Sequence, residues 1–438
     1  MERAIIQQLK KWKEKSDRKP LLLFGARQIG KTWILKYFGE KMFSNTAYFS
    51  FDEEPALSEI FRQSKDPKRI IEQLSFAKGS AIRPNETLIV FDEIQECPEV
   101  LAALKYFCEN APEYAVAAAG SLLGISFGRS SFSFPVGKVD HIDMFPLTFS
   151  EFLLAKDEPL FGYYNSISEL SPIPELFFYR LSETFTAYQI CGGLPAAAMK
   201  MIDGDIAGAE SVVDSILKDY SLDIVKHTQP AAANKINYVW ESLPSQLAKE
   251  NRKFVYQLVR PGARAREYED ALMWLQNAGL VYRVNLCKEP VMPLRAYDDL
   301  SIFKIYTFDI GILRRLAGLG TAVIVGSDAE MKEFKGALAE NYVLQSLITQ
   351  YGRNFRYWSS GNQAEIEFLM QTNDKIIPIE VKSGIAVRGN SLVEFEKKYH
   401  PKIRLRYSMR NLTLDGNLLN IPLFLSDLTP RFLSLAGI

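Results

Sequence analysis

The chain has few of the side chains from which zinc clusters, disulfide frameworks and histidine catalysis are built. Its 438 residues include three histidines, His141, His227 and His400. Its four cysteines lie far apart and never form a CxxC pair. Zinc sites and disulfide-rich folds usually need such residues close together in the sequence. We therefore expect no structural zinc, no disulfide framework, and no thiol or histidine catalysis.

The sequence also lacks an excess of charge of either sign. Lysine plus arginine and aspartate plus glutamate number 52 each, so the whole-chain charge supports neither a nucleic-acid nor a membrane partner. Any basic surface must be local. No apolar run has the roughly 20 residues that cross a membrane, and the lysine-rich start lacks the apolar stretch of a signal peptide. We therefore expect a cytoplasmic protein without a membrane partner.

Apolar runs separated by helical patterns fill the first third of the chain. Four of these runs read as short buried strands, at residues 20–24, 47–51, 87–91 and 114–120. Unbroken apolar strands that alternate with helices are typical of a parallel sheet covered on both faces. The predicted fold class is therefore α/β.

The rest of the chain predicts further units. Residues 150–228 read as helices, interrupted at 191–195 by a turn, because Gly-Gly frees the backbone and proline disfavours a helical residue before it. A helix at 268–278, ended by a glycine and followed by a strand at 280–284, suits a winged-helix module. The remainder indicates a separate α/β unit. The full length of 438 residues corresponds to about three domains of typical size.

A phosphate-binding pattern, GxxxxGK(S/T), is present at residues 25–32, directly after an apolar run and directly before a helical pattern. In this context backbone N–H groups wrap the phosphates, and the helix N-terminus adds partial positive charge. Lys31 is expected to reach the terminal phosphates, and the Thr32 hydroxyl to ligate Mg²⁺. The residues expected to bind ATP are Gly25, Arg27, Gln28, Ile29, Gly30, Lys31, Thr32 and Trp33.

Two carboxylates end the buried strand at 87–91. We expect Asp92 to hold Mg²⁺ together with Thr32, and Glu93 to polarise the attacking water. The alternative is a solvated strand end with no catalytic role, which the upstream phosphate loop disfavours. The sequence therefore predicts an ATPase with ATP and Mg²⁺ as its cofactors.

A small hydroxyl follows the next predicted strand, at Gly120-Ser121. Ser121 either senses the γ-phosphate between the loop and Glu93, or belongs only to a turn. The catalytic residues expected at the ATP site are Lys31, Glu93 and Ser121.

Several segments resemble a large prokaryotic family of AAA+ ATPases, and they lie at 25–32, 91–95, 119–121 and 145–152. The resemblance continues at 192–195, 304–311 and 365–382, so it spans nearly the whole chain. In that family a winged-helix-like region and a restriction-endonuclease-like domain follow the ATPase. The chain departs at Ala26, where the family usually has proline, and at Trp33, where it usually has a small residue. Neither departure removes a phosphate contact.

The resemblance implies a fold in which a P-loop NTPase parallel sheet with a helical lid precedes a winged-helix-like middle domain and a C-terminal α/β restriction-endonuclease-like domain. The expected domains are 1–155 for the P-loop AAA+ ATPase core, 156–228 for the lid, 229–300 for the winged-helix-like domain and 301–438 for the nuclease-like domain.

Two predicted strands near the C-terminus bring carboxylates together. They lie at 364–370 and 376–382, and a two-residue turn at 373–374 would set Glu367 directly across from Glu380. The alternation of side chains puts Lys382 on the same face as Glu380. Facing carboxylates need a cation, either Lys382 alone or a bound divalent metal. The alternative without a function is that the two glutamates are charges on a solvated hairpin face, neutralised by Lys382.

These positions resemble the PD-(D/E)XK nuclease pattern. The resemblance implies Glu340 on a helix, Glu367 in place of the usual aspartate, and then Glu380 and Lys382 as the catalytic set. It also implies a divalent metal held by Glu367 and Glu380. The departure lies at Glu367, whose extra methylene shifts its carboxylate relative to an aspartate.

Two functions follow as hypotheses. The first is an AAA+ ATPase that binds and hydrolyses ATP and is coupled to a nuclease-like domain that acts on or binds DNA. The alternative is a nucleotide-operated switch whose C-terminal modules only bind a nucleic-acid or protein partner. A small-molecule kinase is disfavoured, because two carboxylates at a strand end suit water activation better. The sequence leaves open a homo-oligomer in which a neighbouring subunit's arginine completes the ATP site.

Overall fold

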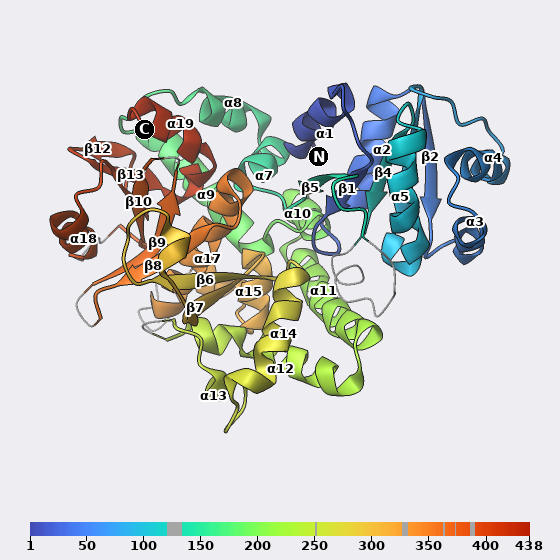
Figure 1. Ribbon diagram of the computed structural model, residues 1–438. Helices are drawn as coiled ribbons and strands as arrows, with labels where there is room; N and C mark the ends of the chain where they lie inside the picture. Colours follow the sequence, from blue (N-terminus) through green and yellow to red (C-terminus); the bar gives the residue numbers. More distant parts are fainter. Residues whose placement is uncertain (121–133, 250–251, 326–331, 362–363, 373, 386–389) are drawn as a thin grey trace. The chain divides into compact units, whose positions relative to one another are not determined.

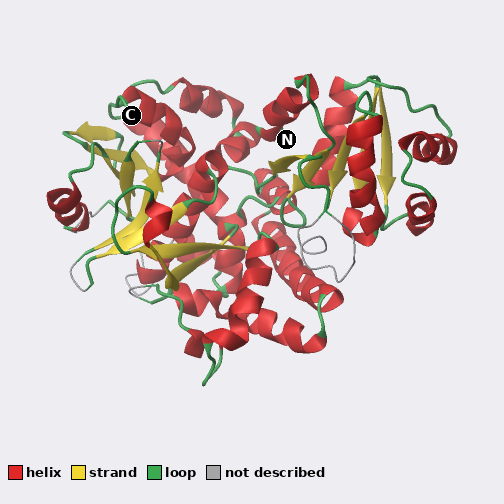
Figure 2. Cartoon of the chain, viewed as in Figure 1, coloured by secondary structure: helices red, strands yellow, loops and turns green. Residues whose placement is uncertain are grey.

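The computed structural model describes residues 1–120, 134–249, 252–325, 332–361, 364–372, 374–385 and 390–438. The chain divides into two compact units (Figure 1). Unit 1 comprises Met1–Phe145 together with Asn277–Gly279, and unit 2 comprises Pro146–Gln276 and Leu280–Ile438. Each unit contains its own sheet (Figure 2).

Unit 1 is built around a five-stranded sheet with the order β2-β3-β4-β1-β5, in which all paired strands are parallel. The strands are β1 Leu21–Phe24, β2 Asn45–Ser50, β3 Thr87–Asp92, β4 Ala115–Ala119 and β5 Asp140–Asp143. The four predicted apolar runs became β1 to β4, so the predicted parallel sheet is confirmed. The sequence did not predict β5, in which three of the four residues are polar and two are exposed.

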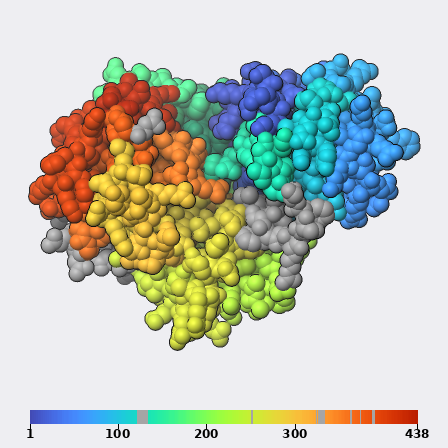
Figure 3. Space-filling view, in the orientation of Figure 1, coloured from blue at the N-terminus to red at the C-terminus, as the bar shows by residue number. Residues whose placement is uncertain are grey.

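The helices of unit 1 pack apolar faces against this sheet. They are α1 Ile5–Glu14, α2 Lys31–Met42, α3 Ser58–Gln63, α4 Pro67–Lys78 and α5 Pro98–Asn110. In α4, Ile70 and Leu74 are buried, whereas the Phe76 side chain is 90% exposed. Figure 3 shows the surface of this part of the chain in blue. The core of this unit includes a cluster of aromatic rings around Phe91, because the rings of Phe49, Phe51, Phe61 and Phe107 lie 5.3 to 6.3 Å from it.

Helices dominate the first half of unit 2. They are α7 Phe149–Lys156, α8 Glu158–Ser166, α9 Glu175–Cys191, α10 Pro195–Ile202, α11 Ile206–His227, α12 Pro230–Leu247, α13 Tyr256–Val259 and α14 Ala265–Asn277. The start of α7 is fixed by a capping box between Thr148 and Glu151. The predicted turn lies between α9 and α10, where Gly192 has a φ of 69°. No helix within the described ranges is long and apolar enough to cross a bilayer.

The second half of unit 2 forms a mixed eight-stranded sheet with the order β12-β13-β11-β10-β9-β8-β6-β7. Its strands are β6 Val281–Cys287, β7 Asp298–Thr307, β8 Phe355–Ser359, β9 Glu365–Gln371, β10 Ile376–Val381, β11 Arg404–Ser408, β12 Thr413–Asp415 and β13 Leu418–Pro422. The accompanying helices are α15 Ile310–Leu316, α16 Thr321–Val325, α17 Lys332–Tyr351, α18 Ser391–Tyr399 and α19 Thr429–Leu435.

The strand expected in a winged-helix module belongs to this same sheet. Strand β6 pairs with β7 on one side and with β8 on the other. The expected boundary at residue 300 falls inside β7. The division into four domains stays a prediction.

A buried polar contact ties two of the family-like segments together inside unit 2. The carboxylate of Asp309, which precedes α15, accepts a hydrogen bond from Gly193 N at 2.7 Å and one from Ile312 N at 3.0 Å. A Cβ on Gly192 would lie 2.2 Å from Asp309 Oδ1. The segments at 192–195 and 304–311 therefore serve packing, because a side chain at Gly192 would collide with this carboxylate.

Candidate functional site

The phosphate loop lies between β1 and α2, as the sequence predicts. Strand β1 ends at Phe24 and α2 begins at Lys31, with Gly30 at its N-cap in the left-handed region at φ 94°. Gln28 also has a positive φ, of 61°. Backbone N–H groups at the start of α2 are therefore available to an anion held by this loop.

The Lys31 ammonium is held inside the loop. Its Nζ donates hydrogen bonds to Gly25 O at 3.1 Å and to Ala26 O at 2.8 Å, and the residue is only 7% exposed. Burial lowers the pKa of Lys31 to about 8, although the carboxylates of Glu93 and Asp92 act in the opposite direction. A buried ammonium that donates to two backbone carbonyl oxygens is well suited to the charges of nucleotide phosphates.

Asp92 ends β3 within reach of the loop. Its Oδ2 accepts hydrogen bonds from Thr32 Oγ1 at 2.6 Å and from Tyr48 OH at 3.0 Å, and its Oδ1 accepts one from Glu93 N at 3.0 Å. Mg²⁺ prefers oxygen ligands and is commonly bound by one or two protein groups together with substrate phosphates. The adjacent hydroxyl and carboxylate of Thr32 and Asp92 fit that requirement.

Tyr48 is a contact that sequence reasoning missed. It lies on β2, which pairs with β3, and burial together with Asp92 raises its pKa. No motif marks a tyrosine at this position of a neighbouring strand.

Glu93 has an unusual backbone. Its φ of 52° and ψ of 45° place it in the left-handed region, which non-glycine residues seldom occupy. Its Oε2 accepts a hydrogen bond from Gln95 Nε2. Such conformations are often found at functional sites, where the surrounding structure compensates for their cost.

The remaining predicted nucleotide contacts are placed differently. Ile29 is fully buried under the loop, Arg27 is half-buried, and Trp33 is 46% exposed and stacks on Tyr37 at 5.0 Å. Strand β4 lies between β1 and β3, as a γ-phosphate sensor at its end requires. Ser121 itself lies outside the described residues.

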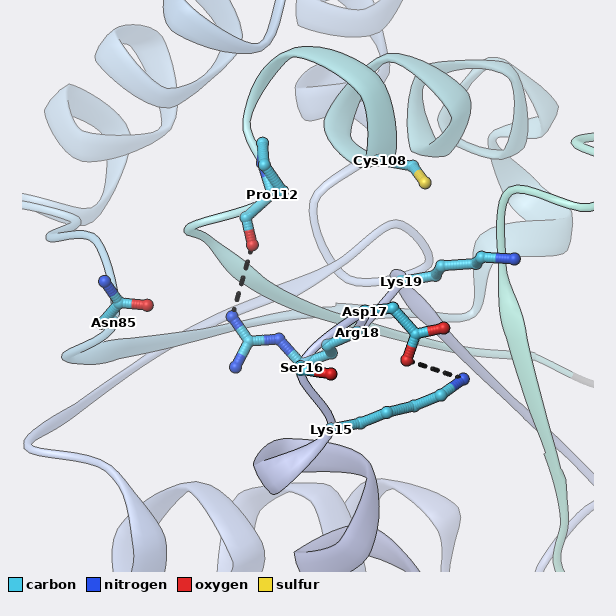
Figure 4. A pocket seen from close by; sticks show the side chains of 8 residues that line it. All are labelled: Lys15, Ser16, Asp17, Arg18, Lys19, Asn85, Cys108 and Pro112. Carbon is cyan, nitrogen blue, oxygen red and sulfur yellow. Dashed lines mark hydrogen bonds and ion pairs between the residues drawn. The ribbon is translucent and has the colours of Figure 1, made fainter.

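A cavity of unit 1 lies away from the phosphate loop and Asp92. Its volume is about 370 Å³, and Figure 4 shows the residues that line it, among them Lys15, Arg18, Asn85 and Pro112. Asn85 and Pro112 precede β3 and β4, whereas the phosphate loop and Asp92 follow β1 and β3 or end them. The cavity thus opens at the opposite edge of the sheet, and we do not assign it to the nucleotide.

In unit 2 the predicted hairpin forms, and it brings the predicted carboxylates together. Strands β9 and β10 pair antiparallel from Ile376 opposite Gln371 to Ile379 opposite Phe368, so the next residues in register are Glu380 and Glu367. Lys382 Nζ lies 3.6 Å from Glu367 Oε1 and 3.4 Å from Glu380 Oε1.

Burial excludes the interpretation of these glutamates as charges on a solvated hairpin face. Glu367 is 7% exposed, Glu380 is fully buried, and Glu340 on α17 is 2% exposed. Burial raises the pKa of Glu367 to about 7; Lys382 lowers it, and the negative charges of Glu340 and Glu380 raise it further. The three glutamates and Lys382 therefore act on one another electrostatically. We call these four residues the carboxylate centre.

Two arginines that the sequence reading did not identify complete the carboxylate centre. Arg406, opposite Glu380 in the register of β10 and β11, places Nε 2.7 Å from Glu380 Oε2. Arg252, in the segment between α12 and α13, forms an ion pair with Glu340, which also accepts a hydrogen bond from Tyr306 OH at 3.0 Å. Arg406 reaches its glutamate through the pairing of two strands, and Arg252 reaches Glu340 through the packing of a helix connection against α17.

The cations around the carboxylate centre decide whether a divalent metal ion can bind there. Three glutamates face three cations, Arg252, Lys382 and Arg406. Within the described part of the chain, no group of three or more His, Cys, Asp or Glu side chains is placed to hold a metal ion. The carboxylate centre, as it stands, does not fit a divalent metal.

Comparison with known families identifies the first unit. Residues 17–153 match the family described as AAA domain. Residues 17–153 form an AAA-type P-loop ATPase domain. The match supports ATP binding and hydrolysis by this domain, whose range includes the phosphate loop, Asp92 and Glu93.

Beyond the AAA domain, the matched families carry no function. Residues 182–322 match a domain of unknown function, DUF8612, and residues 335–424 match another, DUF4143. The second of these ranges contains the carboxylate centre. No curated protein matches the chain.

Several solved structures are similar to the chain at low sequence identity. The Walker-type ATPase PABY2304 of Pyrococcus abyssi is 17% identical, with 71% of this chain and 94% of that chain covered and a TM-score of 0.44. The RuvB Holliday junction branch migration motor of Thermotoga maritima is 11% identical, with 65% and 89% covered and a TM-score of 0.29. AMPPCP-bound DnaA from Aquifex aeolicus is 16% identical, with 62% and 86% covered and a TM-score of 0.28. At these TM-scores the likenesses carry no weight for function.

Proposed function

We propose that the AAA domain hydrolyses ATP with Lys31 on the terminal phosphates and Glu93 as the residue that orients water and accepts its proton. The observation that supports this proposal most strongly is the hydrogen bond of 2.6 Å between Thr32 Oγ1 and Asp92 Oδ2, beside the buried Lys31 ammonium. Thr32 and Asp92 would hold Mg²⁺, which when bound neutralises phosphate charge. The γ-phosphate role of Ser121 stays part of this proposal.

We further propose that unit 2 is the output module of a nucleotide-operated switch, which binds a nucleic-acid or protein partner without cleaving it. Its support is the charge balance of the carboxylate centre, in which Glu340 and Glu380 already have arginine partners. A cleaving centre would need carboxylates free to hold a divalent metal against the scissile phosphate.

A nuclease coupled to the ATPase is the second candidate, with DNA as its substrate. It is favoured by the convergence of Glu367, Glu380 and Lys382 on one hairpin. In this reading Glu340 would complete the catalytic set. A homo-oligomer also stays a proposal, and light scattering with and without ATP would test it.

One titration separates these functions. Phosphate release from ATP and nicking of supercoiled DNA would be followed with rising Mg²⁺ or Mn²⁺, for wild type, Lys31→Ala and Lys382→Ala. The switch predicts ATP hydrolysis that is lost only in Lys31→Ala, and no nicking by any of the three proteins. Metal-dependent nicking by wild type that disappears in Lys382→Ala would replace the switch by the nuclease.

A further inference from the structure

The backbone conformation of Arg252, a hydrogen bond and an ion pair fix the position of its side chain. Its φ of 47° lies in the left-handed region, and its side chain is only 14% exposed. Its Nε donates a hydrogen bond to Leu247 O at 3.3 Å, and its guanidinium pairs with Glu340. A Cβ on Gly336 would lie 2.9 Å from a terminal nitrogen of this guanidinium, so the glycine of α17 leaves it room.

The charge of Arg252 acts on the whole carboxylate centre. Burial lowers the pKa of Arg252, but Glu340, Tyr306, Glu367 and Glu365 raise it, and the net direction is upward. The protonated guanidinium is therefore stabilised by several carboxylates and not by Glu340 alone.

Arg406 approaches the same centre from β11. It pairs with Glu380 at 2.7 Å and is 14% exposed. Lys382 lies between Glu367 and Glu380. A divalent ion that entered could meet Glu380 Oε1, which is buried without a hydrogen-bond partner, but it would add two positive charges to a group in which three carboxylates already face three cations. Its entry would require one cation to leave, since like charges in a buried site repel strongly.

We infer that Arg252 and Arg406 are tethered cations that occupy the carboxylate centre of unit 2 and exclude divalent metal ions from it. The contact of Arg252 with Glu340 is thus inhibitory, and a metal site forms when the Arg252 or Arg406 side chain is withdrawn. This inference concerns the same carboxylate centre that supports the proposed switch and deepens that proposal, but it makes a separate claim about metal occupancy that holds whether or not ATP is hydrolysed.

Mn²⁺ binding to the full-length, nucleotide-free protein tests this inference. Free Mn²⁺ would be followed by electron paramagnetic resonance in wild type, Arg252→Gln and Arg406→Gln, after circular dichroism has shown that each variant is folded. We expect each arginine variant to gain a site for Mn²⁺ that binds about tenfold or more tightly than any Glu367-dependent site of wild type, since a nearby like charge has been removed. Adding Glu367→Gln to either variant should abolish the gain.

The matched control is Arg260→Gln, which removes an exposed arginine of the neighbouring segment and should bind Mn²⁺ as wild type does. If Arg252→Gln does not fold, Arg406→Gln provides the same test from the other side of the centre. A folded arginine variant that gains no Mn²⁺ would overturn the inference. A Glu367-dependent Mn²⁺ site of equal affinity in wild type would overturn it as well.

Discussion

Burial of Lys31 gives ATP binding by the AAA domain a defined pH dependence. In the nucleotide-free protein burial lowers the pKa of Lys31 to about 8. The phosphates of ATP would raise this pKa again, because they favour the charged ammonium. Above pH 8, therefore, ATP binding should be accompanied by uptake of a proton on Lys31.

The size of this effect follows from the pKa. At about pH 9 roughly a tenth of the Lys31 side chains would be protonated, so the ATP affinity should fall about tenfold per pH unit, or about 1.4 kcal/mol. Phosphate monoesters complete their second ionisation near pH 6, so the nucleotide itself contributes little in this range. The ATP affinity should fall as pH rises, because the Lys31 side chain gains its proton when ATP binds.

Isothermal titration calorimetry can measure both the ATP affinity and the number of protons taken up on binding. ATP would be titrated between about pH 7 and about pH 9 in buffers of different ionisation enthalpy, which report the protons taken up. Lys31→Arg is the control, because a guanidinium stays charged throughout this range. Equal ATP affinity of wild type at both pH values, without proton uptake, would refute the assignment of a buried, pKa-lowered Lys31 to the phosphates.

Three further predictions concern single residues. Glu93→Gln should still bind ATP but lower the turnover rate by roughly 100-fold to 10,000-fold, and a rate equal to wild type in a phosphate-release assay would remove Glu93 from catalysis. Gly192→Ala should destabilise unit 2 by about 2 kcal/mol or more in urea unfolding, because the added Cβ meets Asp309 at 2.2 Å. The control Gly204→Ala has open space around it and should cost only about 1 kcal/mol, the cost of a left-handed backbone for an alanine. Because the folded pKa of Glu367 is raised from 4.5 to about 7, wild type should lose stability relative to Glu367→Gln as pH rises through that window. A difference between these two proteins that does not change with pH would contradict the raised pKa.

Features that depend on neighbours in sequence could be predicted. The phosphate loop needs only a strand, a glycine-rich turn and a helix start in sequence, and Asp92 needs only a strand end. The pairing of Glu367 with Glu380 depends on the length of one turn, and the structure has the expected register.

Features that depend on residues distant in sequence could not be predicted. Tyr48 reaches Asp92 from a neighbouring strand, and Arg406 reaches Glu380 in the same way. Arg252 comes from a connection between two helices. No spacing rule relates such residues, because the sheet order that joins them is a tertiary property. The same reason explains why β6 was not expected beside β8.

The central claim is that the phosphate loop of the AAA domain hydrolyses ATP. The most direct test is the steady-state rate of phosphate release at saturating MgATP for wild type, Lys31→Ala and Lys41→Ala, the last of which removes an exposed lysine of the same helix. We predict that wild type and Lys41→Ala release phosphate at equal rates and that Lys31→Ala falls to the rate without protein. An unchanged rate in Lys31→Ala would contradict the account.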